Sequence, residues 1–274
     1  MTDVPDLVDP PLLPLRRRNA AAFFDLDRTL IKGASAFTFG KAAWRSGMLP
    51  THRLVTDGLS ALAFQLRGAS DAKVDRTRAR ILGAVKGASQ ADLVALNAVI
   101  IPKLLGRVRP EAVELIDLHR RAGRHTFIVS ASPQELVEPL AYALGMTGGI
   151  GTVAEVVDGV YSGELAGPFT YGPGKAVAME AAARRNSYDL ERCYSYSDSA
   201  SDLPMLELVG HPVAVNPDPA LATIAHQRGW PIVEFSRRTR RWVRRASAGA
   251  SAVGLAAGAF VAGRQAGRRH PHQP

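Results

Sequence analysis

An apolar run that ends in two acidic residues constrains this chain more than any other feature. Ala20 to Phe24 is too short for a helix of its own and is typical of a buried strand, and Asp25 and Asp27 follow it. Side chains alternate along a strand, so both carboxylates are expected to start on the same side. Such carboxylates repel each other unless a cation lies nearby or one is protonated, and Mg²⁺ suits this place. The alternative is a strand that simply ends in an acidic turn.

Three further segments, far apart in the sequence, carry the other groups that such a site needs. A second apolar run ends at the hydroxyl of Ser130, and a third strand-like segment ends in the acids Asp198 and Asp202. Lys175 stands at the start of a helical pattern. Taken singly, Ser130 is typical of a helix N-cap, Lys175 of a solvated surface and the acid pair of a helix start. Their conjunction with the first segment favours a shared catalytic site.

The alternation of strand-like and helical segments predicts an α/β fold with a largely parallel sheet and helices on both faces. The strand-like runs are 20–26, 125–130, 193–197, 212–216 and 231–235. The polar groups named above follow strand ends, which is where open α/β sheets bind ligands.

Three local patterns carry further predictions. Asp158-Gly159, between alternating segments from 153 to 165, predicts a hairpin turn. Ser132 followed by Pro133 predicts an N-cap and a first helical position. Cys193 is the single cysteine, which excludes an intrachain disulfide and a cysteine-cluster metal site, and we expect it to be buried.

In their order along the chain, the four segments resemble the motifs of the haloacid dehalogenase (HAD) superfamily of phosphohydrolases. These motifs are D-x-D-x-T, a strand-end Ser or Thr, a lysine, and D-x-x-x-D after a strand, and they match 25–29, Ser130, Lys175 and 198–202. The resemblance covers roughly 20–235 and implies a Rossmann-like core. The phosphoserine phosphatase (SerB-like) branch, subfamily IB, is the most similar, because the chain carries Gly-Pro-Gly-Lys and Ser-Asp-Ser-Ala-Ser-Asp.

The resemblance implies a catalytic pair and a metal. Asp25 would be the nucleophile that forms an aspartyl-phosphate, and Asp27 would serve as general acid and then as general base. Mg²⁺ would be held by Asp25, the backbone carbonyl of Asp27, and Asp198.

The resemblance also implies roles for the remaining matched residues. Ser130 and Lys175 would bind phosphate oxygens and offset charge in the transition state. Thr29 would orient the first loop, and Asp202 would steady Lys175 or a metal-bound water.

The sequence departs from the phosphoserine phosphatases at one informative position. Those enzymes carry a glutamate for the substrate's amino group nine residues after the nucleophile, and this chain has Ala34 there. We therefore expect a small phosphorylated substrate, either phosphoserine-like or a lipid-type phosphate. The rival hypotheses are a phosphotransferase that uses an alcohol acceptor, and a non-catalytic, membrane-attached interaction protein.

The resemblance and the composition together predict four parts. About 80 residues separate Leu30 from Pro110, where the superfamily places a helical C1 cap. The predicted parts are a flexible N-terminal extension at 1–19, a discontinuous core at 20–38 and 110–235, a cap at 39–109 and a basic tail at 236–274.

The charge of the chain is concentrated in that tail. The net charge is +9, and nine arginines but no acidic residue follow Glu234. The rest of the chain then has 25 basic and 25 acidic residues, so its formal charge is zero and we expect no nucleic-acid partner.

The tail also contains an uncharged, Ala- and Gly-rich stretch, 246–263, between two arginine clusters. One reading is association with an anionic membrane surface, spanning or interfacial, and the others are a mobile tail or a protein- or RNA-binding tail. Residues 1–15 lack the pattern of a signal peptide. We therefore expect a cytoplasmic catalytic domain, peripheral to the inner face of the membrane or anchored there if the first reading holds.

Overall fold

The computed structural model describes residues 19–47, 78–79, 82–83 and 85–235. Parts of the chain with their own predictions lie outside the described residues. They are the predicted tail at 236–274, the predicted N-terminal extension up to residue 18, and residues 48–77, 80–81 and 84 of the predicted cap.

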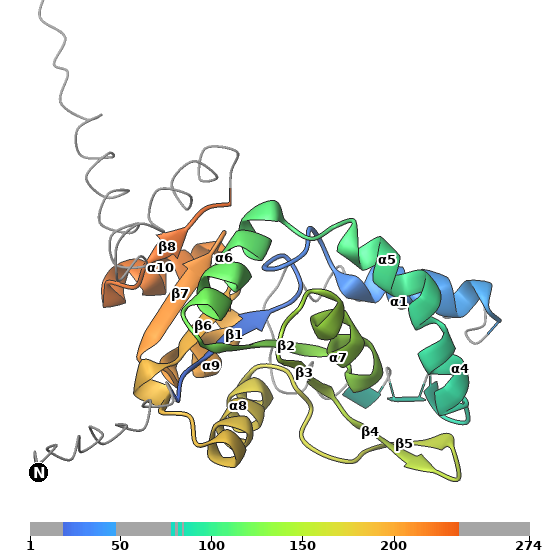
Figure 1. Ribbon diagram of the computed structural model, residues 1–274. Helices are drawn as coiled ribbons and strands as arrows, with labels where there is room; N and C mark the ends of the chain where they lie inside the picture. Colours follow the sequence, from blue (N-terminus) through green and yellow to red (C-terminus); the bar gives the residue numbers. More distant parts are fainter. Residues whose placement is uncertain (1–18, 48–77, 80–81, 84, 236–274) are drawn as a thin grey trace, which may run out of the picture.

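A six-stranded parallel sheet forms the centre of the fold (Figure 1). The strand order is β3-β2-β1-β6-β7-β8. Their bounds are β1 Ala21–Asp25, β2 His125–Pro133, β3 Gly148–Thr152, β6 Tyr194–Ser197, β7 His211–Val215 and β8 Ile232–Val233. The prediction of a parallel α/β sheet is confirmed, and each of the five predicted runs forms one of these strands.

Neighbouring side chains of β1 enter different cores, so both faces of the sheet are buried. Phe24 belongs to a core that helices α6 and α7 complete, whereas Phe23 belongs to a core that α8 and α9 complete. Helix α10 packs on β7 through Leu221 and Ala214. The helices run over α6 Pro110–Arg121, α7 Gln134–Ala143, α8 Pro173–Asn186, α9 Leu203–Glu207 and α10 Pro219–Arg228, and the short 3₁₀ helices over η1 Leu190–Arg192 and η2 Ala200–Asp202. Burial on both faces explains why β1 is a continuous apolar run.

Strand β3 was not predicted, because its sequence is rich in glycine, which is depleted in strands. The structure gives the reason for this composition. A Cβ atom at Gly149 would lie 2.6 Å from the backbone of Val137, and one at Gly151 would lie 2.7 Å from the backbone of Gln134. Helix α7 thus packs directly on the backbone of this edge strand.

Three helices of the region between β1 and β2 lie together beside the sheet (Figure 1). They are α1 Ser35–Arg45, α4 Gln90–Ala95 and α5 Asn97–Leu105. The two ends of this region meet: Arg109 N donates to Leu30 O at 2.9 Å, and Lys32 N donates to Arg107 O at 2.9 Å.

The predicted hairpin is present. Strands β4 (Ala154–Val157) and β5 (Val160–Leu165) pair in antiparallel fashion. The turn residues Asp158 and Gly159 have φ values of 50° and 80°, the left-handed conformation that this turn type requires. The hairpin also forms a bridge from Val160 to Ser89, just before α4.

One local prediction was wrong. We expected Ser132 to cap a helix with Pro133 at its first position, but β2 extends through Pro133 and α7 begins at Gln134 with no side-chain cap. The Ser132 hydroxyl is engaged elsewhere, 2.9 Å from Ser35 Oγ. The predicted burial of Cys193 is confirmed.

Among the residues that the structure describes, no helix has the length and apolar character required to cross a membrane. The stretch at 246–263 lies outside them.

Candidate active site

The register of the sheet brings the acidic residues of two motifs to the same edge. Asp25 is the last residue of β1 and pairs with Val129 of β2, so Ser130 follows immediately on the neighbouring strand. On the other side, Phe24 pairs with Tyr196 of β6, and Asp198 comes two residues later. Parallel strands thus deliver these polar side chains to one carboxyl-terminal edge.

A buried lysine connects the acidic residues of the first and fourth motifs. Lys175 Nζ, from the first turn of α8, lies 2.5 Å from Asp25 Oδ1 and 2.7 Å from Asp202 Oδ2. All three side chains are less than a tenth exposed. The Ser197 hydroxyl donates a further hydrogen bond of 2.7 Å to Asp202 Oδ2. The lysine and both carboxylates therefore form one desolvated ion cluster.

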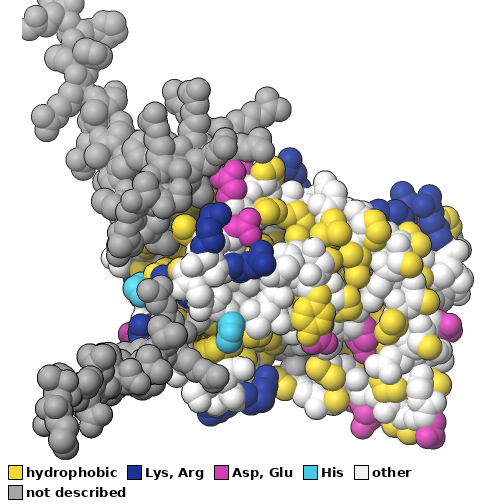
Figure 2. All heavy atoms as spheres, viewed as in Figure 1, with side chains coloured by type: hydrophobic (Ala, Val, Ile, Leu, Met, Phe, Trp, Pro, Cys, Tyr) yellow, Lys and Arg dark blue, Asp and Glu magenta, His cyan; other side chains and the backbone are white. Residues whose placement is uncertain are grey.

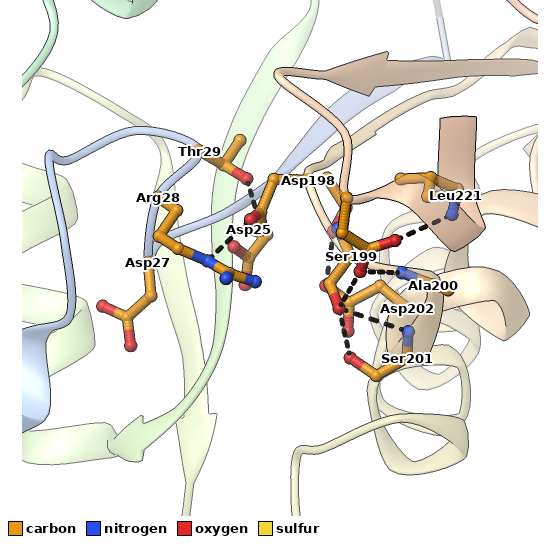
Figure 3. A network of polar contacts seen from close by, with 12 residues as sticks. Asp25, Asp27, Arg28, Thr29, Asp198, Ser199, Ala200, Ser201, Asp202 and Leu221 are labelled. Atoms are coloured by element: carbon orange, nitrogen blue, oxygen red, sulfur yellow. Dashed lines mark hydrogen bonds and ion pairs between the residues drawn. The ribbon is translucent and has the colours of Figure 1, made fainter. Parts of the chain in front are cut away.

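The loop after β1 holds Asp27 in a different environment. Ser35 N, at the start of α1, donates to Asp27 Oδ1 at 2.6 Å. Figure 3 shows the Asp27 carboxylate directed away from Asp198. The Ser35 hydroxyl contacts Ser132, whose backbone N–H donates to Ser130 Oγ at 3.2 Å. Asp27 and Ser130 are thus linked through Ser35, which the sequence analysis did not single out, and Ser132, which it treated only as a helix cap.

A second ion pair lies at Asp198 (Figure 3). Arg28 Nε lies 2.7 Å from Asp198 Oδ2, and Thr29 Oγ1 donates to Asp198 Oδ1 at 3.5 Å. Arg28 occupies the variable position of the D-x-D-x-T motif, so the motif itself gave no signal for it. Thr29 supports the carboxylate of the fourth motif.

Burial and neighbouring charges shift the pKa values of these groups. Burial raises the pKa of Asp25 to about 8, although Lys175 opposes the shift, and it raises the pKa of Asp198 to about 7, with Arg28 opposing. Burial also raises the pKa of Asp27, which the hydrogen bond from Ser35 partly offsets. Burial alone would lower the pKa of Lys175, but the carboxylates of Asp202 and Asp25 raise it.

The charge balance of this cluster suits a divalent cation. The formal charge of the cluster is −2 when all groups are ionised. Four carboxylates and two cations contribute to it: Asp25, Asp27, Asp198 and Asp202, with Lys175 and Arg28. Carboxylate oxygens are the donors that Mg²⁺ prefers. No group of three or more His, Cys, Asp or Glu side chains with the arrangement of a metal site occurs in the described ranges. The ligand set that the resemblance implies, with the Asp25 and Asp198 side chains and the Asp27 carbonyl, stays a prediction.

An arginine from the far end of the inserted region fixes the loop after Asp27. Arg107 donates to the carbonyl oxygens of Lys32 and Ala34 and, at 2.8 Å, to Thr38 Oγ1. The sequence analysis assigned no role to Arg107, since its pattern is that of an exposed helix-end residue.

The model of the haloacid dehalogenase-like hydrolases matches residues 22–207, which include all the residues of this site. The chain belongs to this family. It is a HAD-type phosphatase of the SerB-like branch, as the relatives below support.

Two curated relatives are from Mycobacterium tuberculosis. Phosphoserine phosphatase SerB1 is 42% identical over 246 residues, which cover 89% of this chain and 79% of the relative. Probable phosphatase Rv3661 is 38% identical over 269 residues, which cover 94% of this chain and 92% of the relative. A protein of unknown function from Bordetella pertussis has a similar solved structure, with a TM-score of 0.69 and 27% identity over 79% of this phosphatase and 99% of that chain.

The described surface does not present a continuous basic field in the view of Figure 2. Lys and Arg side chains lie there in separate groups among apolar and acidic ones. This distribution agrees with the zero formal charge of the chain outside its tail.

Proposed function

We propose that this phosphatase is a Mg²⁺-dependent phosphomonoester hydrolase that works through an aspartyl-phosphate on Asp25. The observation that carries the proposal is the buried bridge from Lys175 to Asp25 and Asp202, at 2.5 and 2.7 Å. It holds a carboxylate and a permanent positive charge together at the end of the central strand. That combination suits attack on a phosphate ester, whose negative charge must be offset as it spreads.

Asp25 attacks and Asp27 transfers protons. Because Lys175 holds Asp25 Oδ1, we assign Oδ2 to the attack on phosphorus. The Oδ2–P bond forms while the ester P–O bond breaks, and Asp27 gives its proton to the leaving oxygen. Water then attacks phosphorus, Asp27 takes the water's proton, and the Oδ2–P bond breaks to release inorganic phosphate. The raised pKa of Asp27 favours the protonated form that the first step requires.

Ser130, Lys175 and Mg²⁺ share the charge of the phosphate group. The Asp25 and Asp198 carboxylates and the Asp27 carbonyl would hold the metal, which when bound would neutralise charge on the phosphate oxygens. Ser130, which lies within β2 next to the end of β1, is 3% exposed, and we assign its Oγ a hydrogen bond to a phosphate oxygen. Asp202 keeps the Lys175 ammonium in place.

We propose that the discontinuous core at 20–38 and 110–235 carries this chemistry and that the segment at 39–109 acts as the cap. The contacts that join Leu30 to Arg109 and Lys32 to Arg107 support this division, because they close the inserted segment at its base.

The substrate class is a small phosphomonoester. Phosphoserine is the first compound to test because of the similarity to SerB1, although Ala34 lacks the carboxylate that would bind its amino group. A lipid-type phosphate is the second class, motivated by the basic tail.

The test is phosphate release from a panel of phosphomonoesters that includes phosphoserine and lysophosphatidate, with Mg²⁺ and with EDTA. Turnover is expected with the metal only. Asp25→Asn should abolish it without loss of folded structure, whereas Asp117→Asn, at a side chain that is 43% exposed on α6, should retain it. Unchanged turnover by the Asp25 variant would overturn the proposed nucleophile. Transfer of phosphate to added alcohol in place of water would indicate a phosphotransferase.

A further inference from the structure

A pocket lies beside the phosphate site, between the core, the β4–β5 hairpin and the helices of the inserted region. Its walls are mostly apolar, with Leu93 from α4, Leu165 from β5 and Phe169 from the segment before α8. It is open to solvent at its mouth. Such walls suit the carbon skeleton of a small molecule.

The pocket adjoins the residues that bind phosphate in the proposed mechanism. Ala131, which lines it, stands between Ser130 and Ser132. The Ala131 carbonyl accepts a hydrogen bond of 2.9 Å from Thr152, another lining residue. Because Ser130 and the lining residue Ala131 are consecutive on β2, we take this pocket as the space for the rest of a substrate whose phosphate Ser130 would hold.

A carboxylate is fixed in the pocket wall. Glu135, in the first turn of α7, accepts hydrogen bonds at Oε1 from Tyr161 Oη (2.9 Å) and Gln90 Nε2 (3.1 Å). Its carbonyl accepts a third, of 2.6 Å, from Asn97 Nδ2. Three elements far apart in sequence thus hold one glutamate in a single orientation.

The second carboxylate oxygen of Glu135 is buried and has no hydrogen-bond partner. A buried, charged acceptor without a donor is destabilising, so such an oxygen is expected to meet a donor from a ligand or water. A charged donor satisfies a carboxylate about twice as strongly as a neutral one.

We propose that this pocket receives the leaving group of the substrate and that Glu135 Oε2 binds a cationic nitrogen on it. This inference rests on the proposed function and narrows the substrate to phosphomonoesters with an amine on an apolar spacer. Glu135 lies on α7, so its position is unrelated to that of Ala34 in the loop after β1. Arg78 also lines the pocket, and no role is assigned to it.

The test compares 3-aminopropyl phosphate with butyl phosphate, which differ only by an ammonium in place of a methyl group. With Mg²⁺, kcat/KM for the amine is expected to exceed that for the alkyl ester by about 10-fold to 100-fold, the range of one hydrogen bond to a charged group. Glu135→Gln keeps the acceptor for Tyr161 and Gln90 but places an NH₂ group at Oε2. In this variant, the ratio of kcat/KM for 3-aminopropyl phosphate to kcat/KM for butyl phosphate should fall to about 1, because only the turnover of the amine decreases.

Glu138→Gln is the matched control, because Glu138 lies on the same helix and bonds to exposed Tyr142. It should keep the wild-type ratio. Equal turnover of both esters by the wild type, or an unchanged ratio in Glu135→Gln, would overturn the inference while leaving the phosphatase intact. A wild type that releases phosphate from neither these esters nor the wider panel would instead count against the proposed function.

A second measurement needs no variant, in case Glu135→Gln does not fold. Free 3-aminopropanol should inhibit hydrolysis of butyl phosphate more strongly than butanol does, by about tenfold in Ki. Equal inhibition by the two alcohols would contradict an anionic pocket.

Discussion

Arg28 Nε lies 2.7 Å from Asp198 Oδ2, so an arginine of the first motif neutralises an acid of the fourth. Arg28 has a φ of 63°, in the left-handed region that side chains other than glycine seldom adopt. This conformation turns the loop after β1 so that the guanidinium reaches the end of β6. The carboxylate that would hold Mg²⁺ therefore already has a positive partner.

Removal of this partner should increase the affinity for Mg²⁺. In Arg28→Gln, the metal no longer competes with a guanidinium for Asp198, and Kd for Mg²⁺ measured by calorimetry should fall about twofold to tenfold. Arg184→Gln removes the same charge from an exposed pair with Glu180 on α8 and should leave the affinity unchanged. Weaker binding by the Arg28 variant would show that the guanidinium supports the metal site.

Arg107 should affect the rate through the loop that it holds. Arg107→Lys keeps the charge but loses the planar fork that reaches Lys32, Ala34 and Thr38. The loop then holds the Ser35 amide, and with it Asp27, less firmly, so kcat should fall about tenfold to 100-fold with little change in KM. Steady-state kinetics check this, with the exposed Arg121→Lys on α6 as the control. A change in KM alone would place Arg107 in substrate binding.

His119 should make the stability depend on pH. The ring is fully buried, 2.7 Å from the Tyr196 hydroxyl, and burial lowers its pKa from 6.5 to about 3, with a smaller contribution from Arg124. Between these values the unfolded chain takes up a proton that the folded chain does not, so stability is lost as the pH falls below 6.5. The slope approaches about 1.4 kcal/mol per pH unit.

His119→Gln isolates this effect. The raised pKa values of Asp25 and Asp198 act in the opposite direction, but both proteins share them. Urea denaturation from pH 7 to pH 4 should therefore show a difference between wild type and variant that shrinks as the pH falls. Parallel curves would contradict the assignment.

Gly149→Ala should destabilise the edge of the sheet. Its Cβ atom would lie 2.6 Å from the Val137 backbone, so β3 and α7 must separate, at a cost of about 1–3 kcal/mol. Gly167→Ala is the control, since nothing lies within 4 Å of its added Cβ atom. Equal melting curves for the two variants would show that β3 and α7 can separate at this edge without loss of stability.

The sequence predicted what depends on local patterns and on their order. Asp25, Ser130 and Asp198 each follow a strand-like run, and parallel strands carry such residues to one edge of the sheet, so their meeting could be expected. Strand β3 could not be predicted, because its glycines are required by the close packing of α7, a tertiary contact that the local sequence pattern does not show.

Arg28 and Glu135 were also beyond a sequence-based prediction. Arg28 reaches its partner only through an unusual backbone conformation. Glu135 reads as an ordinary residue of a first helical turn, and its partners Gln90 and Tyr161 come from segments whose meeting no periodicity encodes.

The hydrogen bond from Arg109 N to Leu30 O places the two ends of the inserted segment side by side. The inserted segment therefore leaves the core and returns to it at the same place, as a closed loop does. The entropic cost of closing such a loop, expressed as a free energy, rises by only about 0.6 kcal/mol for each doubling of the loop length. A change in the length of the segment therefore adds little to the entropic cost of closing the loop. A fold closed in this way can change what it recognises while the residues that carry out the reaction stay where they are.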